Sequence, residues 1–97
     1  MLDEKTINEI KKIIFKYVDG QKDKVFIFWS RATGDGRKFS DVDIGIKSTR
    51  ELKGEILINI KDACEESNIP YNIDIVDFSN VSKEFSNLAL KKIIKLN

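Results

Sequence analysis

Residues 25–47 read VFIFWSRATGDGRKFSDVDIGIK and are the most informative part of the sequence. Near its end, Ser-Asp-Val-Asp places two acidic residues, Asp41 and Asp43, at alternate positions. Side chains alternate between the faces of a strand, so this pattern predicts that both carboxylates lie on one face while Val42 lies on the other. Carboxylates spaced roughly 7 Å apart along a strand can bind one divalent cation or flank two metal ions about 4 Å apart. We therefore take this pair as the candidate metal-binding centre.

The rest of this stretch predicts two strands joined by an unusual connection. Val25–Phe28 is a short apolar run rich in β-branched and aromatic residues, which is typical of a strand buried on both faces. A second strand is expected at residues 42–47. Between them, hydroxyl, basic and glycine residues favour a helical turn at residues 30–33 and then a glycine-bearing loop. Free N–H groups at the start of such a turn bind anions, and Ser30 would add a hydroxyl group.

The flanking segments predict the remaining elements. Apolar residues at three- and four-residue spacing favour amphipathic helices, and alternation favours strands. We expect a helix from residue 3 to about 18, a helix at residues 50–67, a strand at residues 71–78 and a last amphipathic helix at residues 82–96. The order is α-β-(turn)-β-α-β-α. This indicates the α/β (α+β) class, a small mixed sheet with flanking helices, which we expect on one side of it.

Composition limits the classes of function. The chain has 97 residues, enough for a single domain (1–97) with one core. It contains 17 Lys and Arg against 16 Asp and Glu, so no basic stripe for direct nucleic-acid binding is expected. With no histidine and only Cys64, a disulfide, a His-based zinc site and a Ser/His/Asp triad are excluded within this chain. The charged, amphipathic N-terminus and the lack of a long apolar run predict a cytoplasmic protein.

A third carboxylate is expected on the last predicted strand. Asp74 shares one face of this strand with Val76 and Phe78, so it lies on an otherwise apolar face, where an unpaired carboxylate is costly. Asp77 is three residues away and therefore faces the other side. The strand register decides which of the two aspartates joins Asp41 and Asp43, and the pattern alone leaves both open.

These residues resemble a known family. Ser30, ten intervening residues and Asp41-x-Asp43, with a later aspartate, are similar to the G-S-x10-D-x-D pattern of the polymerase-beta-like nucleotidyltransferase superfamily. A chain this short resembles its minimal nucleotidyltransferases (MNT). Two segments are similar to the family consensus almost residue for residue: Ser30-Arg31-Ala32-x-Gly34-Asp35 and Ser40-Asp41-x-Asp43-Ile44. One position departs from it, because Trp29 stands where the family has glycine.

The resemblance implies a nucleotidyltransferase that moves AMP from ATP to a hydroxyl group, with pyrophosphate leaving. It implies Mg²⁺, in a two-metal site, held by Asp41, Asp43 and Asp74, and it favours Asp74 over Asp77 as the third carboxylate. In this arrangement Asp74 also activates the acceptor hydroxyl. The nucleotide would lie against Trp29, Ser30 and Arg31. The implied partner is a helical HEPN-family RNase, a toxin whose tyrosine is adenylylated, which makes this chain the antitoxin.

Two other functions stay open. The chain could neutralise its partner by binding alone, with an active site impaired at Trp29. It could instead modify a small molecule such as an aminoglycoside, although the missing substrate-binding domain counts against this function unless a homodimer builds the pocket.

Overall fold

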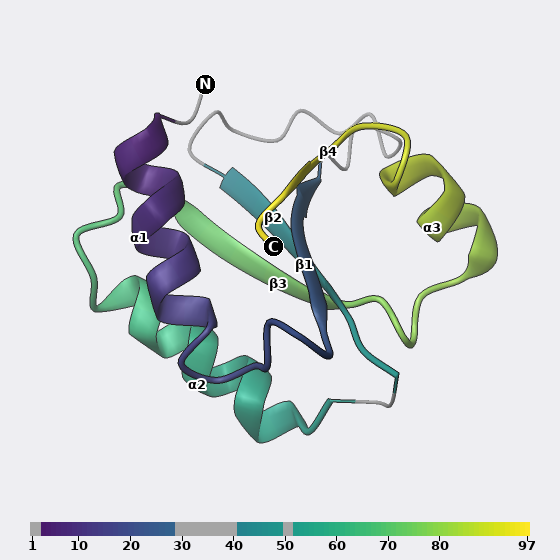
Figure 1. Ribbon diagram of the computed structural model, residues 1–97, viewed down its shortest axis with the longest axis horizontal. Coiled ribbons are helices and arrows are strands. Elements are labelled where there is room, and N and C mark those ends of the chain that lie inside the picture. Colours follow the sequence, from purple (N-terminus) through teal and green to yellow (C-terminus); the bar gives the residue numbers. More distant parts are fainter. Residues whose placement is uncertain (1–2, 29–40, 50–51) are drawn as a thin grey trace.

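The structure, a computed structural model, describes residues 3–28, 41–49 and 52–97, with the backbone alone at Asp41. Within these ranges the helices and strands follow one another in this order (Figure 1): α1 (Glu4–Ile14), β1 (Lys24–Phe28), β2 (Asp41–Lys47), α2 (Gly54–Glu65), β3 (Asn72–Asp77), α3 (Lys83–Ala89) and β4 (Ile93–Lys95). Both expected strands of the 25–47 stretch are present. Within the described ranges, no helix is long and apolar enough to cross a membrane.

The strands form one mixed sheet in the order β3-β2-β1-β4. β1 pairs antiparallel with both β2 and β4, whereas β2 and β3 are parallel. The parallel pair is possible because α2 carries the chain back between β2 and β3. The predicted class, a small mixed sheet with flanking helices, is therefore confirmed.

One face of the sheet packs against α1 and α2 (Figure 1). Apolar side chains from alternate strand positions meet those of the two helices here. The buried members are Ile10, Ile13, Ile14, Val18, Val25, Ile27, Val42, Ile44, Ile46, Ile60, Cys64, Ile73 and Leu96. Burial of this many branched apolar side chains is the main stabilising contribution that the sequence can make.

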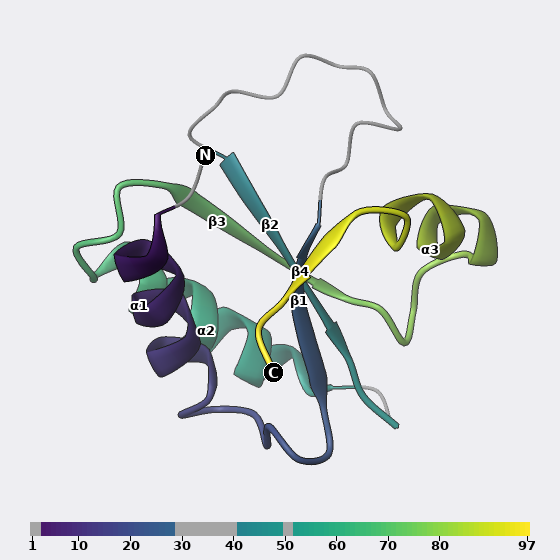
Figure 2. The same ribbon diagram turned by 45° about the horizontal axis from the view of Figure 1, so that its top comes forward.

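The other face carries a second cluster of aromatic side chains, which we call the aromatic cluster: Phe26, Phe28, Phe78 and Phe85. The ring of Phe78 lies edge-on to those of Phe26 and Phe28, with centroids 4.9 and 5.1 Å away. α3 lies on the side of the sheet away from α1 and α2 (Figure 2), and it contributes Phe85 and the buried Ala89 to this cluster. Helices therefore cover both faces, and the expectation of helices on one side was wrong. The reason is the buried β1, whose alternate positions present large rings to the second face.

The last predicted helix, residues 82–96, divides into two elements. α3 ends at Ala89, and Ile93–Lys95 forms β4 on the open edge of β1, with Ile93 opposite Phe28. A central strand that is buried on both faces needs hydrogen-bonding partners on both edges, and β4 supplies the second one. Tertiary pairing therefore overrides the helical spacing of residues 93–96.

Helix ends follow local chemistry. The Asp3 carboxylate caps α1, accepting a hydrogen bond of 2.8 Å from the backbone N–H of Thr6. α1 is shorter than the predicted segment, because turns replace the helix after Ile14 while Val18 still reaches the core. α2 begins at Gly54, later than predicted, and Lys53 at its N-cap forms no side-chain cap.

Candidate active site

Two of the predicted carboxylates lie side by side. Asp43 on β2 and Asp74 on β3 are direct partners in the parallel ladder. Partners in a ladder share a face, and neighbouring strands are about 4.8 Å apart, so both side chains emerge at adjacent points of one surface. Asp43 is buried, with 6 % of its surface exposed, whereas the Asp74 side chain is 42 % exposed. The pair therefore has one inner and one outer carboxylate.

The pair lies on the face of the aromatic cluster. Asp43 is opposite Phe28 in the antiparallel ladder, so the Phe28 ring flanks Asp43 on the side away from Asp74. The next row on this face holds Gly45 and Val76, followed by Phe78 after the end of β3. A carboxylate at the border of an apolar cluster is poorly hydrated, and a bound cation stabilises it there more than it would in open water.

Gly45 allows the aromatic cluster to approach β2 closely. A Cβ atom at this position would lie 2.5 Å from carbons of both the Phe26 and Phe78 rings, closer than packed atoms come. Because Gly45 is two residues after Asp43, it lies on the same face. The absence of a side chain here lets the rings pack on the β2 backbone directly beside the acidic pair.

Asp77, the alternative third carboxylate, is on the opposite face. It is opposite Ile46, and its side-chain oxygens accept hydrogen bonds from the Leu52 N–H at 3.2 Å, the Ser79 N–H at 2.9 Å and the Ser79 hydroxyl at 2.6 Å. These bonds hold the turn after β3 against the segment before α2. The structure therefore brings Asp74, and not Asp77, next to Asp43.

The other predicted site residues cannot be placed. The Asp41 backbone is opposite Asn72 at the start of β2, while its side chain and the whole of Trp29, Ser30 and Arg31 lie outside the described residues. Among the described side chains, no group of three metal-ligating residues comes together. Asp43 and Asp74 nevertheless fit a Mg²⁺ site, because this ion prefers carboxylate oxygens and uses one or two of them with water and phosphate.

A hollow of about 650 Å³ opens beside Asp74 along the outer edge of β3. Its lining comes from the end of α2, the following loop and the start of β3: Lys61, Cys64, Glu65, Ile69, Pro70, Tyr71, Asn72, Ile73 and Asp74. Lys61 reaches the acidic pair, with its Nζ atom 3.7 Å from Oδ1 of Asp74. Sequence reasoning missed Lys61, because a lysine on the polar side of an amphipathic helix belongs to no motif.

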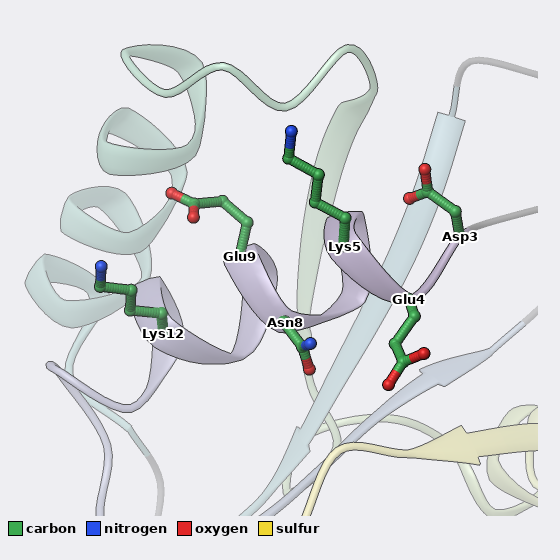
Figure 3. Close-up of a pocket in the computed structure, with 6 residues that line it drawn as sticks. All are labelled: Asp3, Glu4, Lys5, Asn8, Glu9 and Lys12. Atoms are coloured by element: carbon green, nitrogen blue, oxygen red, sulfur yellow. The ribbon is translucent and has the colours of Figure 1, made fainter.

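A second hollow, of about 630 Å³, lies along α1 (Figure 3). Its lining residues all come from one helix and its cap: Asp3, Glu4, Lys5, Asn8, Glu9 and Lys12. The hydrogen bond from Thr6 holds the pKa of Asp3 below its ordinary value, which fits its role as a helix cap. Among the described residues, the lining therefore comes from the outer surface of a single helix, which is an open surface rather than an enclosed site for chemistry.

The mixed sheet, with adjacent carboxylates on two parallel strands, is the arrangement expected of a nucleotidyltransferase domain. Residues 8–96 match the family described as "Polymerase beta, Nucleotidyltransferase", and the chain belongs to this family. The match includes every strand of the sheet and both members of the acidic pair.

Within this family, the chain is similar to the "Probable protein adenylyltransferase MntA" of Haemophilus influenzae. The two are 33% identical over 67 residues, which are 69% of this chain and 59% of that relative. The chain therefore matches about three fifths of the length of the relative.

Solved structures share the fold. One belongs to a complex described as tri-AMPylated Shewanella oneidensis HEPN toxin with MNT antitoxin (TM-score 0.75, 17% identity, 99% of this chain and 72% of that chain). Another belongs to a toxin-antitoxin crystal structure with AMP-PNP (TM-score 0.69, 19% identity, 94% of this chain and 72% of that chain). At this level of identity the likeness shows the fold alone.

Proposed function

We propose that this chain is a Mg²⁺-dependent nucleotidyltransferase that transfers AMP from ATP to a tyrosine hydroxyl of a HEPN-type RNase, and so acts as its antitoxin. Membership of the nucleotidyltransferase family and the name of the H. influenzae relative support the reaction. The two similar structures, one in a complex with an AMPylated HEPN toxin and one with AMP-PNP, support the partner and the nucleotide. The proposal places the chain in the cytoplasm, because its single free thiol, Cys64, needs no oxidising compartment.

The observation that carries this proposal is the pairing of Asp43 with Asp74. Two carboxylates at adjacent points of one face repel each other, and a divalent cation bound between them would offset this repulsion. Asp41 precedes Asp43 by two residues and so belongs to the same face of β2. The proposed metal ligands are therefore Asp41, Asp43 and Asp74.

In the reaction, the acceptor oxygen forms a bond to the α-phosphorus of ATP, and the bond from this phosphorus to the pyrophosphate oxygen breaks. The proton of the acceptor hydroxyl goes to the Asp74 carboxylate, which is the more exposed of the pair and so the one that an acceptor can reach. Bound Mg²⁺ supplies positive charge that stabilises the transferred phosphoryl group and the leaving pyrophosphate. Asp43, held against Phe28, keeps a fixed position as a ligand.

The nucleotide side of the site is proposed from the sequence. Ser30 and the N–H groups that follow it would hold phosphate oxygens, and Arg31 would add a positive charge. Trp29 would border the nucleotide in the position of the family glycine.

Intact-mass spectrometry tests the proposal. The chain is incubated with Mg-ATP and a purified HEPN-type RNase as the partner, and the partner is expected to gain AMP. Asp43→Asn and Asp74→Asn should abolish the gain. Asp77→Asn is the matched control, since it also removes one negative charge from β3 but on the face away from Asp74. The folded part of this variant should transfer AMP as the wild type does. No AMP on the partner with the unaltered chain would refute the proposed activity.

One sequence feature favours a second candidate, an antitoxin that acts by binding alone. Trp29 replaces the glycine that, in the family, lets the backbone approach the nucleotide phosphates. In this case Asp43→Asn would still protect cells from the toxin, and the complex would form without a change in mass. Under this second candidate, Trp29→Gly should restore or raise AMP transfer. If the wild-type site is active instead, Asp43→Asn should fail to protect cells from the toxin.

A further inference from the structure

Lys61 lies at the border between the buried and exposed sides of α2. It follows the fully buried Ile60 and precedes the buried Cys64 by three residues, so its stem starts beside the core. α2 packs against β3, which is the outer strand of the sheet. A long, flexible side chain from this position can therefore reach around the strand edge to the face that holds Asp74.

The contact between Lys61 and Asp74 joins two half-exposed groups. Nζ of Lys61 is 3.7 Å from Oδ1 of Asp74, and the side chains are 50% and 42% exposed. A pair this accessible is weakly held and can separate at little cost. Asp43, by contrast, is 94% removed from solvent, since only 6% of it is exposed. An amine that approaches from the solvent side can therefore neutralise Asp74 but not Asp43.

A divalent cation and the Lys61 ammonium group compete for this carboxylate. A metal ligand oxygen lies about 2.0–2.6 Å from Mg²⁺ or Ca²⁺, so a metal at Asp74 would come within a few ångströms of the ammonium group unless Lys61 moved away. Repulsion between the two positive charges is appreciable at this distance even near a protein surface. Metal binding at Asp74 thus requires Lys61 to withdraw.

We propose that Lys61 is a positioning residue that sets the metal affinity of the active site, by neutralising Asp74 until a divalent cation displaces it. This inference rests on the proposed function, because it takes Asp74 as a metal ligand. With Lys61 paired to Asp74, the active site should bind a divalent metal ion weakly when no nucleotide is present. A metal ion that arrives with a nucleotide brings negative phosphate charge with it and competes better, so the site favours the metal–nucleotide complex over the free metal.

Titration of free Mn²⁺, followed by electron paramagnetic resonance at low ionic strength without nucleotide, tests this role. Removing the charge in Lys61→Met should tighten Mn²⁺ binding roughly two- to fivefold, the range expected for a solvent-exposed ion pair. Lys61→Arg keeps the charge and should bind Mn²⁺ like the wild type. Lys12→Met, at an exposed position near the end of α1, is the matched control and should change nothing. The gain in Lys61→Met should shrink in high salt, which screens the ammonium charge.

Metal-free thermal melts establish that each variant is folded, and Lys61→Gln replaces Lys61→Met if the latter is not. Equal or weaker Mn²⁺ binding by the folded, uncharged variant overturns the role of Lys61. Failure of the proposed function looks different: the wild-type chain would then bind no Mn²⁺ and transfer no AMP. AMP transfer by the wild type, together with unchanged Mn²⁺ affinity in Lys61→Met, removes the inference about Lys61 alone.

Discussion

Gly45→Ala tests the packing that supports the acidic pair. The added methyl group would meet the Phe26 and Phe78 rings at 2.5 Å, so at least one of these rings must move. Both belong to a cluster of mutually packed rings, with centroids 4.9 Å apart for this pair, and neither can swing into solvent without exposing its neighbours. The strain is steric, because the Gly45 backbone does not occupy the left-handed region.

Overpacking of this kind typically costs about 1–3 kcal/mol. For a domain of this size each kcal/mol lowers Tm by about 4–8 °C, so we expect Gly45→Ala to melt roughly 4–24 °C below the wild type. The assay is thermal and urea unfolding, followed by circular dichroism, without metal or nucleotide. Gly54→Ala is the control: nothing lies within 4 Å of its added Cβ, and alanine suits the first turn of α2 better than glycine. It should melt at or slightly above the wild-type temperature.

A second substitution separates packing from other effects. Phe26→Leu removes one of the two rings that the new methyl group meets, so the double variant should lose less stability than the sum of the single variants. Strict additivity, or a Gly45→Ala protein as stable as Gly54→Ala, would refute the view that the rings rest on the β2 backbone.

Three further predictions follow from single contacts. The Ser82 hydroxyl oxygen caps α3 by accepting a hydrogen bond of 3.1 Å from the backbone N–H of Phe85. Ser82→Ala removes this cap and should lower the free energy of unfolding by about 1 kcal/mol in urea titrations, and an unchanged midpoint would contradict this prediction. The Asn97 side chain accepts a hydrogen bond from the Val25 N–H (3.0 Å) and donates to the carbonyl oxygens of Gly20 and Asp23 (both 2.7 Å). Asn97→Ala removes these bonds and should lower the free energy of unfolding by about 1–3 kcal/mol in the same assay. No change would mean that these bonds do not hold the C-terminus. Burial, with a smaller contribution from Glu65, raises the pKa of the Cys64 thiol to about 11, so it should react with a thiol reagent at pH 8 far more slowly in the folded chain than in denaturant. Above about pH 9 the unfolded state loses the Cys64 proton while the folded state keeps it, so the contribution of Cys64 to stability is present below about pH 9 and falls as the pH rises toward 11. Cys64→Ala should lack this decline in stability, and the same alkaline slope in both proteins would contradict the assignment.

Much of the fold follows from local pattern. The buried run at Val25–Phe28, the alternation after Asp41 and the amphipathic spacing of the first two helices each predict the element that forms. Alternation also predicts that Asp74 and Asp77 face opposite sides, which the ladder confirms. These predictions succeed because the period of a helix or a strand is a property of consecutive residues.

Prediction from local sequence pattern fails at the end of the chain. Residues 93–95 fit a helical pattern, yet they form β4 because the free edge of β1 offers hydrogen bonds that only the folded sheet provides. The same holds for Gly45, whose importance depends on rings that come from β1 and from the turn after β3. Neither is visible in a window of neighbouring residues.

The order of residues is enough to recognise the family, the Asp41-x-Asp43 spacing and the chemical types at the site. The folded chain adds three facts: β3 lies beside β2 in the register that joins Asp74 to Asp43, the aromatic cluster flanks them, and Lys61 reaches Asp74 around the strand edge. The physical reason is that side-chain periodicity is set by local backbone geometry. Strand order and register are set instead by which apolar faces can be buried together, and that depends on the whole chain.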